Sequence, residues 1–249
     1  MPEGSVPSEP AEPNELRETV IMTTLTLVAG AVDAITFLTM GHVFAALATG
    51  NVLFLAFALA DGGQVPVARS AVALSAFTVG VAVASFVAHR LVTHRWFPAA
   101  LVGEAALLGL AGTLALLRHG IGSLAHDPDL VVIAIVALAM GMRAAFVLRA
   151  AVPGMPTLLV QMSLVRLLAD VVTHLRLPAG REAALQRLAR IRLGATVGGM
   201  FLGGALGTLM VPWGTGRALI AVAAAVLVLS AVHFSQPRHR PPEAGEQPG

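Results

Sequence analysis

A single carboxylate, Asp33, lies in the middle of an otherwise uncharged stretch that runs from Thr19 to Met40. An ionised carboxylate at the centre of a bilayer costs roughly 2.5–3.5 kcal/mol, so such a residue usually has a partner or a task. A second apolar stretch, one helix length further on, carries Thr49-Gly50-Asn51. These three residues place a hydroxyl, a flexible backbone position and an amide within one turn. Together with Asp33 they could bind a proton, a small ion or the positive group of a solute.

The same residues also have a structural interpretation. Asp33 could be paired with Arg143, which occupies a near-equivalent place in the second half of the chain. Thr49 and Asn51 could instead form interhelical hydrogen bonds, with Gly50 as a close packing point. The two interpretations are compatible, because an Asp33–Arg143 pair that opens and closes would be a gate.

Other polar residues inside apolar segments extend the set of candidates. Glu104 lies eight residues past Trp96, well inside its segment, and is either a proton carrier or the partner of an arginine on a neighbouring helix. Gln161 and Ser163 stand in the second half near where Thr49 and Asn51 stand in the first. The candidate pathway residues are Asp33, Thr49, Gly50, Asn51, Glu104, Arg143, Gln161 and Ser163.

Several classes of function are not expected. The chain has no Cys, hence no thiol nucleophile or Cys-based metal site. No H-x-x-x-H, H-E-x-x-H, P-loop or G-x-S-x-G pattern occurs, so we expect no metal, no cofactor, no catalytic residue and no enzyme. The basic residues are all Arg and widely dispersed, and aromatic residues make up only 5%, which argues against nucleic acid as a partner.

The elements that must position these residues are membrane helices. Of the 249 residues, 56% are hydrophobic and 12% are charged, against roughly a quarter charged in soluble domains. The mean hydropathy is +0.80. Two charge-free runs, Ser70–Ala88 and Leu193–Gly216, have the 17–25 residues that a helix needs to cross a bilayer. The sequence therefore predicts an all-α, polytopic helical membrane protein in the plasma membrane of a bacterium, with the bilayer as its first partner.

Two topologies compete. Apolar segments fall at about 20–40, 43–60, 69–89, 97–117, 130–149, 155–172, 193–212 and 217–235. Either all eight span, or six span while 43–60 and 155–172 are short or re-entrant. Counting arginines on each side slightly favours six spans. Both topologies place the two termini and the loop 173–192 in the cytoplasm, where that basic loop would meet anionic lipid headgroups.

The chain is expected to form one transmembrane domain, 19–235, between two disordered tails. The first tail, 1–18, is acidic and Pro-rich, and the second, 236–249, is Pro-rich. Small residues recur every four positions at Ala76, Gly80, Ala84 and Ala88, and again at Gly199, Gly203 and Gly207. Such ladders let helices approach closely within a chain, and the alternative is a homodimer through Gly199, Gly203 and Gly207.

The two halves, 19–118 and 130–235, weakly repeat each other. Gly30-Ala31-Val32-Asp33-Ala34 aligns with Gly141-Met142-Arg143-Ala144-Ala145, and Trp96 with Trp213. The ladder aligns Gly80 and Ala84 with Gly199 and Gly203. Duplicated halves are common in secondary transporters. Six spans would make the repeats inverted, and eight would make them parallel.

The chain resembles the YoaK-like family of bacterial inner-membrane proteins, which carry a domain of unknown function. The resemblance covers about 19–235 and rests on Ala29-Gly30-Ala31-Val32-Asp33-Ala34, on Val43-Phe44 before Thr49-Gly50-Asn51, and on Met140-Gly141-Met142. It implies the membrane fold but no established activity. In the second half the family tends to show an amide and a second Thr-Gly, where this chain has Arg143-Ala144 and Gln161-Met162-Ser163.

Two functional hypotheses follow. The first is a small-solute or ion permease in which Asp33, Asn51 and Arg143 line a site at the bilayer midplane. The second is a membrane scaffold or sensor whose buried polar residues only hold helices together.

Overall fold

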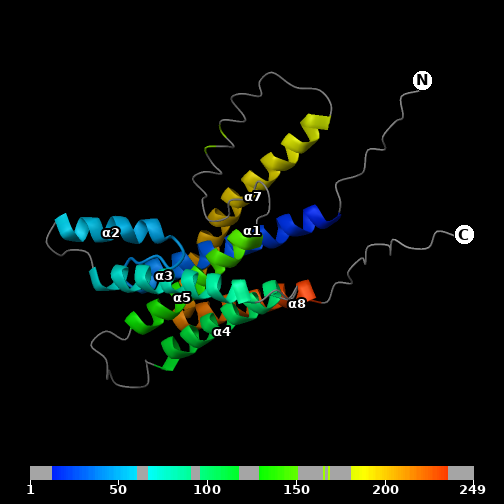
Figure 1. Cartoon of the computed structure of the whole chain (residues 1–249). Coiled ribbons are helices and arrows are strands. Elements are labelled where there is room, and N and C mark those ends of the chain that lie inside the picture. The colour runs from blue at the N-terminus through cyan, green and yellow to red at the C-terminus, as the bar shows by residue number, and fades with distance from the viewer. Residues whose placement is uncertain are drawn as a thin grey trace, which may run out of the picture.

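The computed structural model describes residues 13–60, 67–90, 96–117, 129–150 and 181–234, together with 165 and 168. These residues form helices and no strand (Figure 1). The helices are α1 (Pro13–Thr39), α2 (Ala48–Ala60), α3 (Val67–Arg90), α4 (Trp96–Leu117), α5 (Asp129–Ala150), α7 (Arg181–Met210) and α8 (Thr215–Phe234), with a short 3-10 turn η1 (Val211–Trp213) before α8. The polytopic helical fold is confirmed. Helix α1 begins at Pro13, inside the stretch that the sequence predicts as a disordered tail.

Six of these helices are long and apolar enough to cross a membrane: α1, α3, α4, α5, α7 and α8. Helix α2 has 13 residues, a length of about 20 Å, which is too short for a hydrocarbon core of about 30 Å. The segment 43–60 therefore does not span as a helix. The other segment in question, 155–172, lies outside the described residues apart from two positions.

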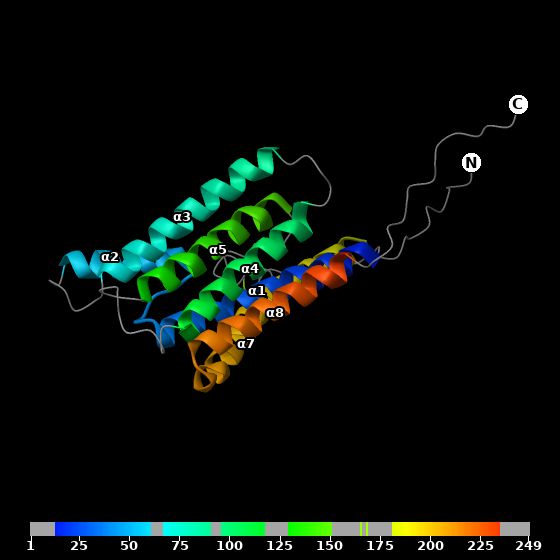
Figure 2. The ribbon, with the colours of Figure 1, turned by 90° about the horizontal axis from the view of Figure 1, so that it is seen from below.

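By their contacts, neighbouring helices follow the order α3, α5, α4, α8, α1, α7, and Figure 2 shows α3 and α7 at opposite edges of the bundle. An ion pair between Arg69 and Asp129, 3.4 Å apart, joins the first turns of α3 and α5, so these helices are parallel. Ser230 near the end of α8 donates a hydrogen bond of 3.2 Å to the carbonyl of Pro98 at the start of α4, so that pair is antiparallel. The six long helices alternate in direction along the chain, and α1 begins at the end of the bundle where α8 ends.

Two pairs of helices pack through glycine. On α7, Gly199, Gly203 and Gly207 lie against the backbone of Thr23, Leu27 and Ala31 of α1. The residue numbers rise together on both sides, so α1 and α7 are parallel. The ladder is therefore used inside the chain, as expected for intramolecular packing. Helix α1 thus covers the face of α7 through which the sequence also allows a homodimer.

The pairing of α3 with α5 uses the same kind of contact. A Cβ on Gly80 would collide with the carbonyl oxygen of Leu138, and a Cβ on Gly141 would collide with that of Phe77. We call this contact the α3–α5 seam and the one between Gly30 and Gly203 the α1–α7 seam. Both depend on glycine because the two backbones touch.

Helix α1 ends in a motif that turns the chain back into the bundle. Gly41 and His42 both have positive φ, +79° and +61°, and the N–H of His42 donates to the carbonyl of Phe37 at 3.1 Å. This is the Schellman pattern, in which glycine relieves the strain of the left-handed residue. The loop that follows, residues 40–47, is drawn into the core, where Met40, Val43 and Ala45 are buried.

Large apolar side chains cover the outside of the bundle. Phe201, Leu148 and Leu209 are 75%, 74% and 70% exposed. A protein surrounded by water seldom exposes such a surface, whereas lipid tails solvate it. The chain is a multi-pass membrane protein.

Candidate functional site

Asp33 lies on α1 beside the loop 40–47 and is only 3% exposed. Its Oδ1 accepts a hydrogen bond of 2.7 Å from the backbone N–H of Ala46. Its Oδ2 has no hydrogen-bond partner among the residues that the structure describes. Asp33 stands six residues before the end of α1, about 9 Å along the helix. It therefore lies between the middle of the bundle and the end that carries the loop.

A cavity of about 310 Å³ borders this carboxylate. We call it the Asp33 cavity. Its wall comes from three places: α1, the loop 40–47 and α7. The lining residues are Gly30, Asp33, Ala34, Phe37, Leu38, Phe44, Met200, Gly204 and Thr208. Apart from Asp33 and the Thr208 hydroxyl, every side chain in this wall is apolar or aromatic.

An aromatic cluster stands beside Asp33. The rings of Phe37 and Phe44 are stacked with centroids 4.8 Å apart, and Phe54 lies 5.8 Å from Phe44 and 6.4 Å from Phe37, so the three rings form a compact triangle. His42 meets Phe37 edge-on at 4.9 Å. The sequence reasoning missed this cluster. Phe37 follows Asp33 by four residues, one helical turn, and that spacing could have pointed to it. No sequence pattern predicted that α7 forms part of the cavity wall.

Gly50 and Asn51 hold the loop, and none of the residues Thr49, Gly50 and Asn51 lines the Asp33 cavity. Asn51 is 1% exposed. Its Oδ1 accepts from the N–H of Phe44 at 3.1 Å, and its Nδ2 donates to the carbonyl of Phe44 at 2.5 Å. A Cβ on Gly50 would meet the Phe44 ring at 2.6 Å. Thr49 is exposed and lines a different cavity. Placing Asn51 in one site with Asp33 is therefore wrong in this structure.

The predicted pair between Asp33 and Arg143 is also wrong. Arg143 instead forms a buried ion pair with Glu104 of α4, and its Nη1 donates to the carbonyl of Leu25 on α1 at 2.8 Å. Arg143 and Glu104 are 4% and 2% exposed. The expectation that Glu104 pairs with an arginine of a neighbouring helix is confirmed. Glu104 of α4 and Arg143 of α5 form the ion pair, and the Leu25 carbonyl of α1 accepts a hydrogen bond from Arg143. These contacts hold the three helices together.

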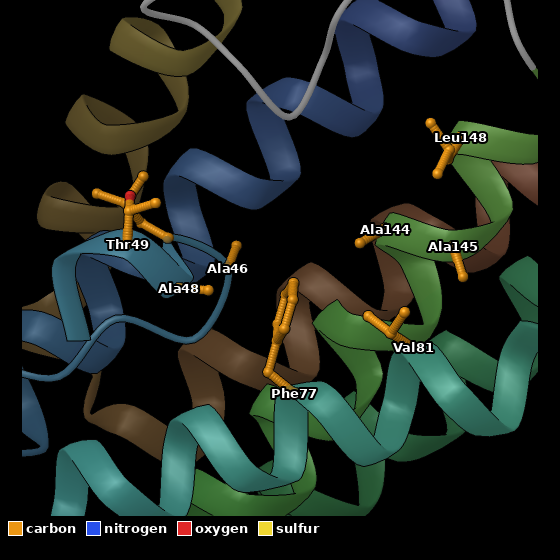
Figure 3. Close-up of a pocket in the computed structure, with 9 residues that line it drawn as sticks. Ala46, Ala48, Thr49, Phe77, Val81, Ala144, Ala145 and Leu148 are labelled. Atoms are coloured by element: carbon orange, nitrogen blue, oxygen red, sulfur yellow. The ribbon is translucent and has the colours of Figure 1, made fainter. Parts of the chain in front are cut away.

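A second cavity of about 280 Å³ lies on the other side of the loop (Figure 3). We call it the Ala144 cavity. Figure 3 shows Phe77 and Val81 of α3 facing Ala144, Ala145 and Leu148 of α5, with the loop and the start of α2 beyond them. The lining residues are Ala46, Leu47, Ala48, Thr49, Phe77, Val81, Ala144, Ala145 and Leu148. This wall contains no ionisable side chain.

Some of the predicted residues cannot be placed. Gln161 and Ser163 lie outside the described residues. The same holds for 173–180 of the basic loop, whereas 181–192 form the start of α7. Near that start, Arg192 donates a hydrogen bond of 3.1 Å to the hydroxyl of Thr19 on α1. Among the described residues, no group of three His, Asp or Glu side chains is placed to hold a metal ion.

Comparison with known proteins agrees with the membrane architecture. The family described as "Protein of unknown function (DUF1275)" matches residues 21–233. The UPF0700 transmembrane protein YoaK of Bacillus subtilis (strain 168) is 30% identical over 154 residues. The aligned part covers 61% of this chain and 66% of that relative, just under two thirds of its length. No solved structure matches. The resemblance to the YoaK-like family is confirmed, and the chain belongs to the DUF1275 family, whose function is unknown.

Proposed function

We propose that this protein is a permease for a small solute or ion, with Asp33 as the residue that binds it. One observation carries the proposal: a carboxylate that is 97% buried, with one oxygen fixed by Ala46 and the other unpartnered in the described structure, borders a cavity of about 310 Å³. An ionisable residue at bilayer depth is a marker of a solute or ion pathway. A carboxylate required only to hold the loop would not need a cavity at its side.

We further propose that the two halves are diverged inverted repeats. Gly30 meets Met200, three residues before Gly203, and Gly141 meets Phe77, three residues before Gly80. The same contact thus recurs in the two seams. The contacts therefore make Gly80 equivalent to Gly203, whereas the sequence alignment makes it equivalent to Gly199, one helical turn earlier.

Helix directions support the same repeat. The neighbour order α3, α5, α4, α8, α1, α7 reads the same from either end once each helix is exchanged for its repeat partner, α1 for α5, α3 for α7 and α4 for α8. Helices α1, α4 and α7 point one way, and α3, α5 and α8 point the other. Inverted repeats that meet at a central site are the architecture of many secondary transporters.

Arginine positions favour one orientation in the membrane. Among the described residues, the bundle end where α1 begins carries more arginines than the opposite end, which has Arg69 and Arg217. Those at the first end are Arg17, Arg90, Arg149, Arg190 and Arg192. The positive-inside rule makes the first end cytoplasmic, with both chain termini on that side and the loop 40–47 on the outer side.

The orientation can be tested because the chain has no Cys. The test uses two single variants, Val65→Cys and Val92→Cys. Both positions lie outside the described residues, in the connections before and after α3. Six spans place position 65 outside and position 92 inside. A membrane-impermeant maleimide applied to intact cells should therefore label only position 65, and permeabilised cells should label both. Labelling of position 92 alone would support eight spans.

Flux tests the pathway itself. The purified protein in proteoliposomes should carry a solute or ion flux that Asp33→Asn abolishes. This variant keeps an oxygen for the Ala46 N–H, so the loop contact survives. Phe77→Leu, in the wall of the Ala144 cavity, is the matched control and should leave the flux intact. An unchanged flux in Asp33→Asn would remove the assigned role.

The second candidate function is a scaffold or sensor, favoured by the Glu104–Arg143 pair and by the two hydrogen bonds from Asn51 to Phe44. These contacts hold the helices and the loop in place. A scaffold predicts no flux in any variant, and loss of thermal stability wherever one of these contacts is removed. We prefer the permease because the free oxygen of Asp33 has no structural use in the described contacts.

A further inference from the structure

We infer that the Asp33 cavity binds a small organic ammonium ion, held by the Asp33 carboxylate and by the aromatic side chains of Phe37 and Phe44 that line the cavity. The inference rests on the proposed function and names the class of its substrate. Three features of the wall carry it: the free carboxylate oxygen, the stacked aromatic rings and the apolar remainder.

The carboxylate sets the sign of the ligand. Asp33 Oδ2 has no partner in the described structure, and Arg143, the nearest candidate counter-ion in the sequence, is engaged by Glu104. An anion would meet the like charge of the carboxylate at short range, which is costly. A cation would supply the missing interaction.

The remaining wall sets the kind of cation. Ca²⁺ takes about six to eight oxygen ligands, and Mg²⁺ about six in an octahedron. The side chains of this wall offer the Asp33 carboxylate and the Thr208 hydroxyl, which already donates to the Gly204 carbonyl at 2.8 Å. Hard metal ions therefore fit poorly. An alkylated ammonium fits well, because its carbon atoms can pack on apolar walls.

The aromatic rings complete the match. Phe37 and Phe44 both line the cavity, stacked 4.8 Å apart at 19°. Three of the ten phenylalanines in the chain lie in this one cluster. Aromatic faces combined with a carboxylate are the usual recognition surface for quaternary ammonium groups. A volume of about 310 Å³ is at the small end of ligand pockets, which limits the ligand to a few carbons beyond the charged nitrogen.

The test compares choline with its neutral isostere 3,3-dimethylbutan-1-ol, using the full-length protein in a nonionic detergent and isothermal titration calorimetry. Choline should bind at least about tenfold more tightly than the alcohol, and Asp33→Asn should remove that preference. Phe37→Leu should weaken choline binding by about 3- to 30-fold. Phe77→Leu, the control from the Ala144 cavity, should change it by less than about twofold.

A lipid headgroup carries the same ammonium chemistry as a free amine. Repeating the titration in nanodiscs of phosphatidylglycerol and of phosphatidylcholine separates these sources. Weaker choline binding in phosphatidylcholine alone would identify the headgroup as the ligand, whereas equal binding in both would identify the free solute. Either result supports an ammonium site.

Two results would overturn the inference: equal affinity for choline and the alcohol, or choline binding that neither Asp33→Asn nor Phe37→Leu changes. Absence of choline binding together with an Asp33-dependent flux of protons or Na⁺ would also overturn it and leave the permease standing. Choline binding without any flux would keep the ammonium site and reject permeation. The two proposals can therefore fail separately.

Discussion

The Asp33 cavity and the Ala144 cavity are built on the same packing and differ in their chemistry. Asp33 follows Gly30 by three residues, and Ala144 follows Gly141 by three. Both glycines stand at a seam where two parallel helices touch. The cavities are close in size, about 310 and 280 Å³. One wall holds a carboxylate, and the other has no ionisable side chain.

Further positions follow the same correspondence. Phe37 lies seven residues after Gly30, and Leu148 lies seven residues after Gly141. On the partner helices, Met200 precedes Gly203 by three residues, and Phe77 precedes Gly80 by three. The second half has the glycine seam without a carboxylate at the matching position. The comparison teaches that the seam is needed for the fold, whereas the carboxylate is not. This separation is what makes Asp33 a candidate for function.

The largest loss of stability should come from Arg143→Ala. Removing one partner of a buried ion pair leaves the other charge uncompensated, at a cost of about 3–5 kcal/mol in free energy of unfolding. Glu104 would be that uncompensated charge. Thermal unfolding in detergent should therefore show a large fall in Tm.

A double mutant checks the pairing. Arg143→Ala with Glu104→Gln should lose less stability than the sum of the two single variants, because the second change removes the stranded charge. Additive losses would contradict direct pairing of Glu104 with Arg143 and reopen the Asp33–Arg143 pair.

Ala144→Asp should rank second, because it puts a carboxylate into the cavity that lacks one. Ala144 is 6% exposed. A charge buried in this way should cost about 2.5–3.5 kcal/mol. Ala144→Asn, of nearly equal size, isolates the charge from the added volume. Equal stability of the two variants would mean that the Ala144 cavity can accommodate a carboxylate as the Asp33 cavity does.

Gly80→Ala and Gly203→Ala should rank third and should match each other. In each, the new Cβ collides with a backbone carbonyl of the partner helix, at a cost of about 1–3 kcal/mol for overpacking. Gly103→Ala is the control, since a Cβ there meets no atom within 4 Å, and Tm should hold or rise. Clearly unequal losses at Gly80 and Gly203 would argue against equivalent seams.

Much of this fold could be predicted from the sequence, because apolar length and small-residue spacing depend on local order along the chain. The six long helices and the use of Gly203 in a tight contact are of this kind. The short length of the segment after His42 was one of two alternatives that the sequence left open, and the structure favours it.

The partners of the buried charges were harder to predict, because they depend on how helices far apart in sequence meet. Arg143 and Glu104 are 39 residues apart, and no local pattern favours Glu104 over Asp33 as the partner. The hydrogen bonds of Asn51 could not be predicted either, because its partner Phe44 lies in an irregular loop. Asp33 itself was found because an isolated charge stands out in any apolar segment.

The smallest change in stability should come from Asp33→Asn, and it decides between the two functions. The amide keeps an oxygen for the Ala46 N–H, so the free energy of unfolding should change by no more than about 1 kcal/mol. Asp33→Ala is the matched comparison. It leaves the Ala46 N–H without its acceptor, at a cost of about 1–3 kcal/mol.

If Asp33 only held the loop, stability and function should fall together, with Asp33→Ala worse than Asp33→Asn in both. If Asp33 binds a cation, Asp33→Asn should keep a near-native Tm and lose flux as completely as Asp33→Ala does. Measuring Tm and flux on the same preparations separates these outcomes, because Oδ1 serves the loop and Oδ2 remains for a ligand. A variant that keeps the first contact and loses the charge therefore tests the second role alone.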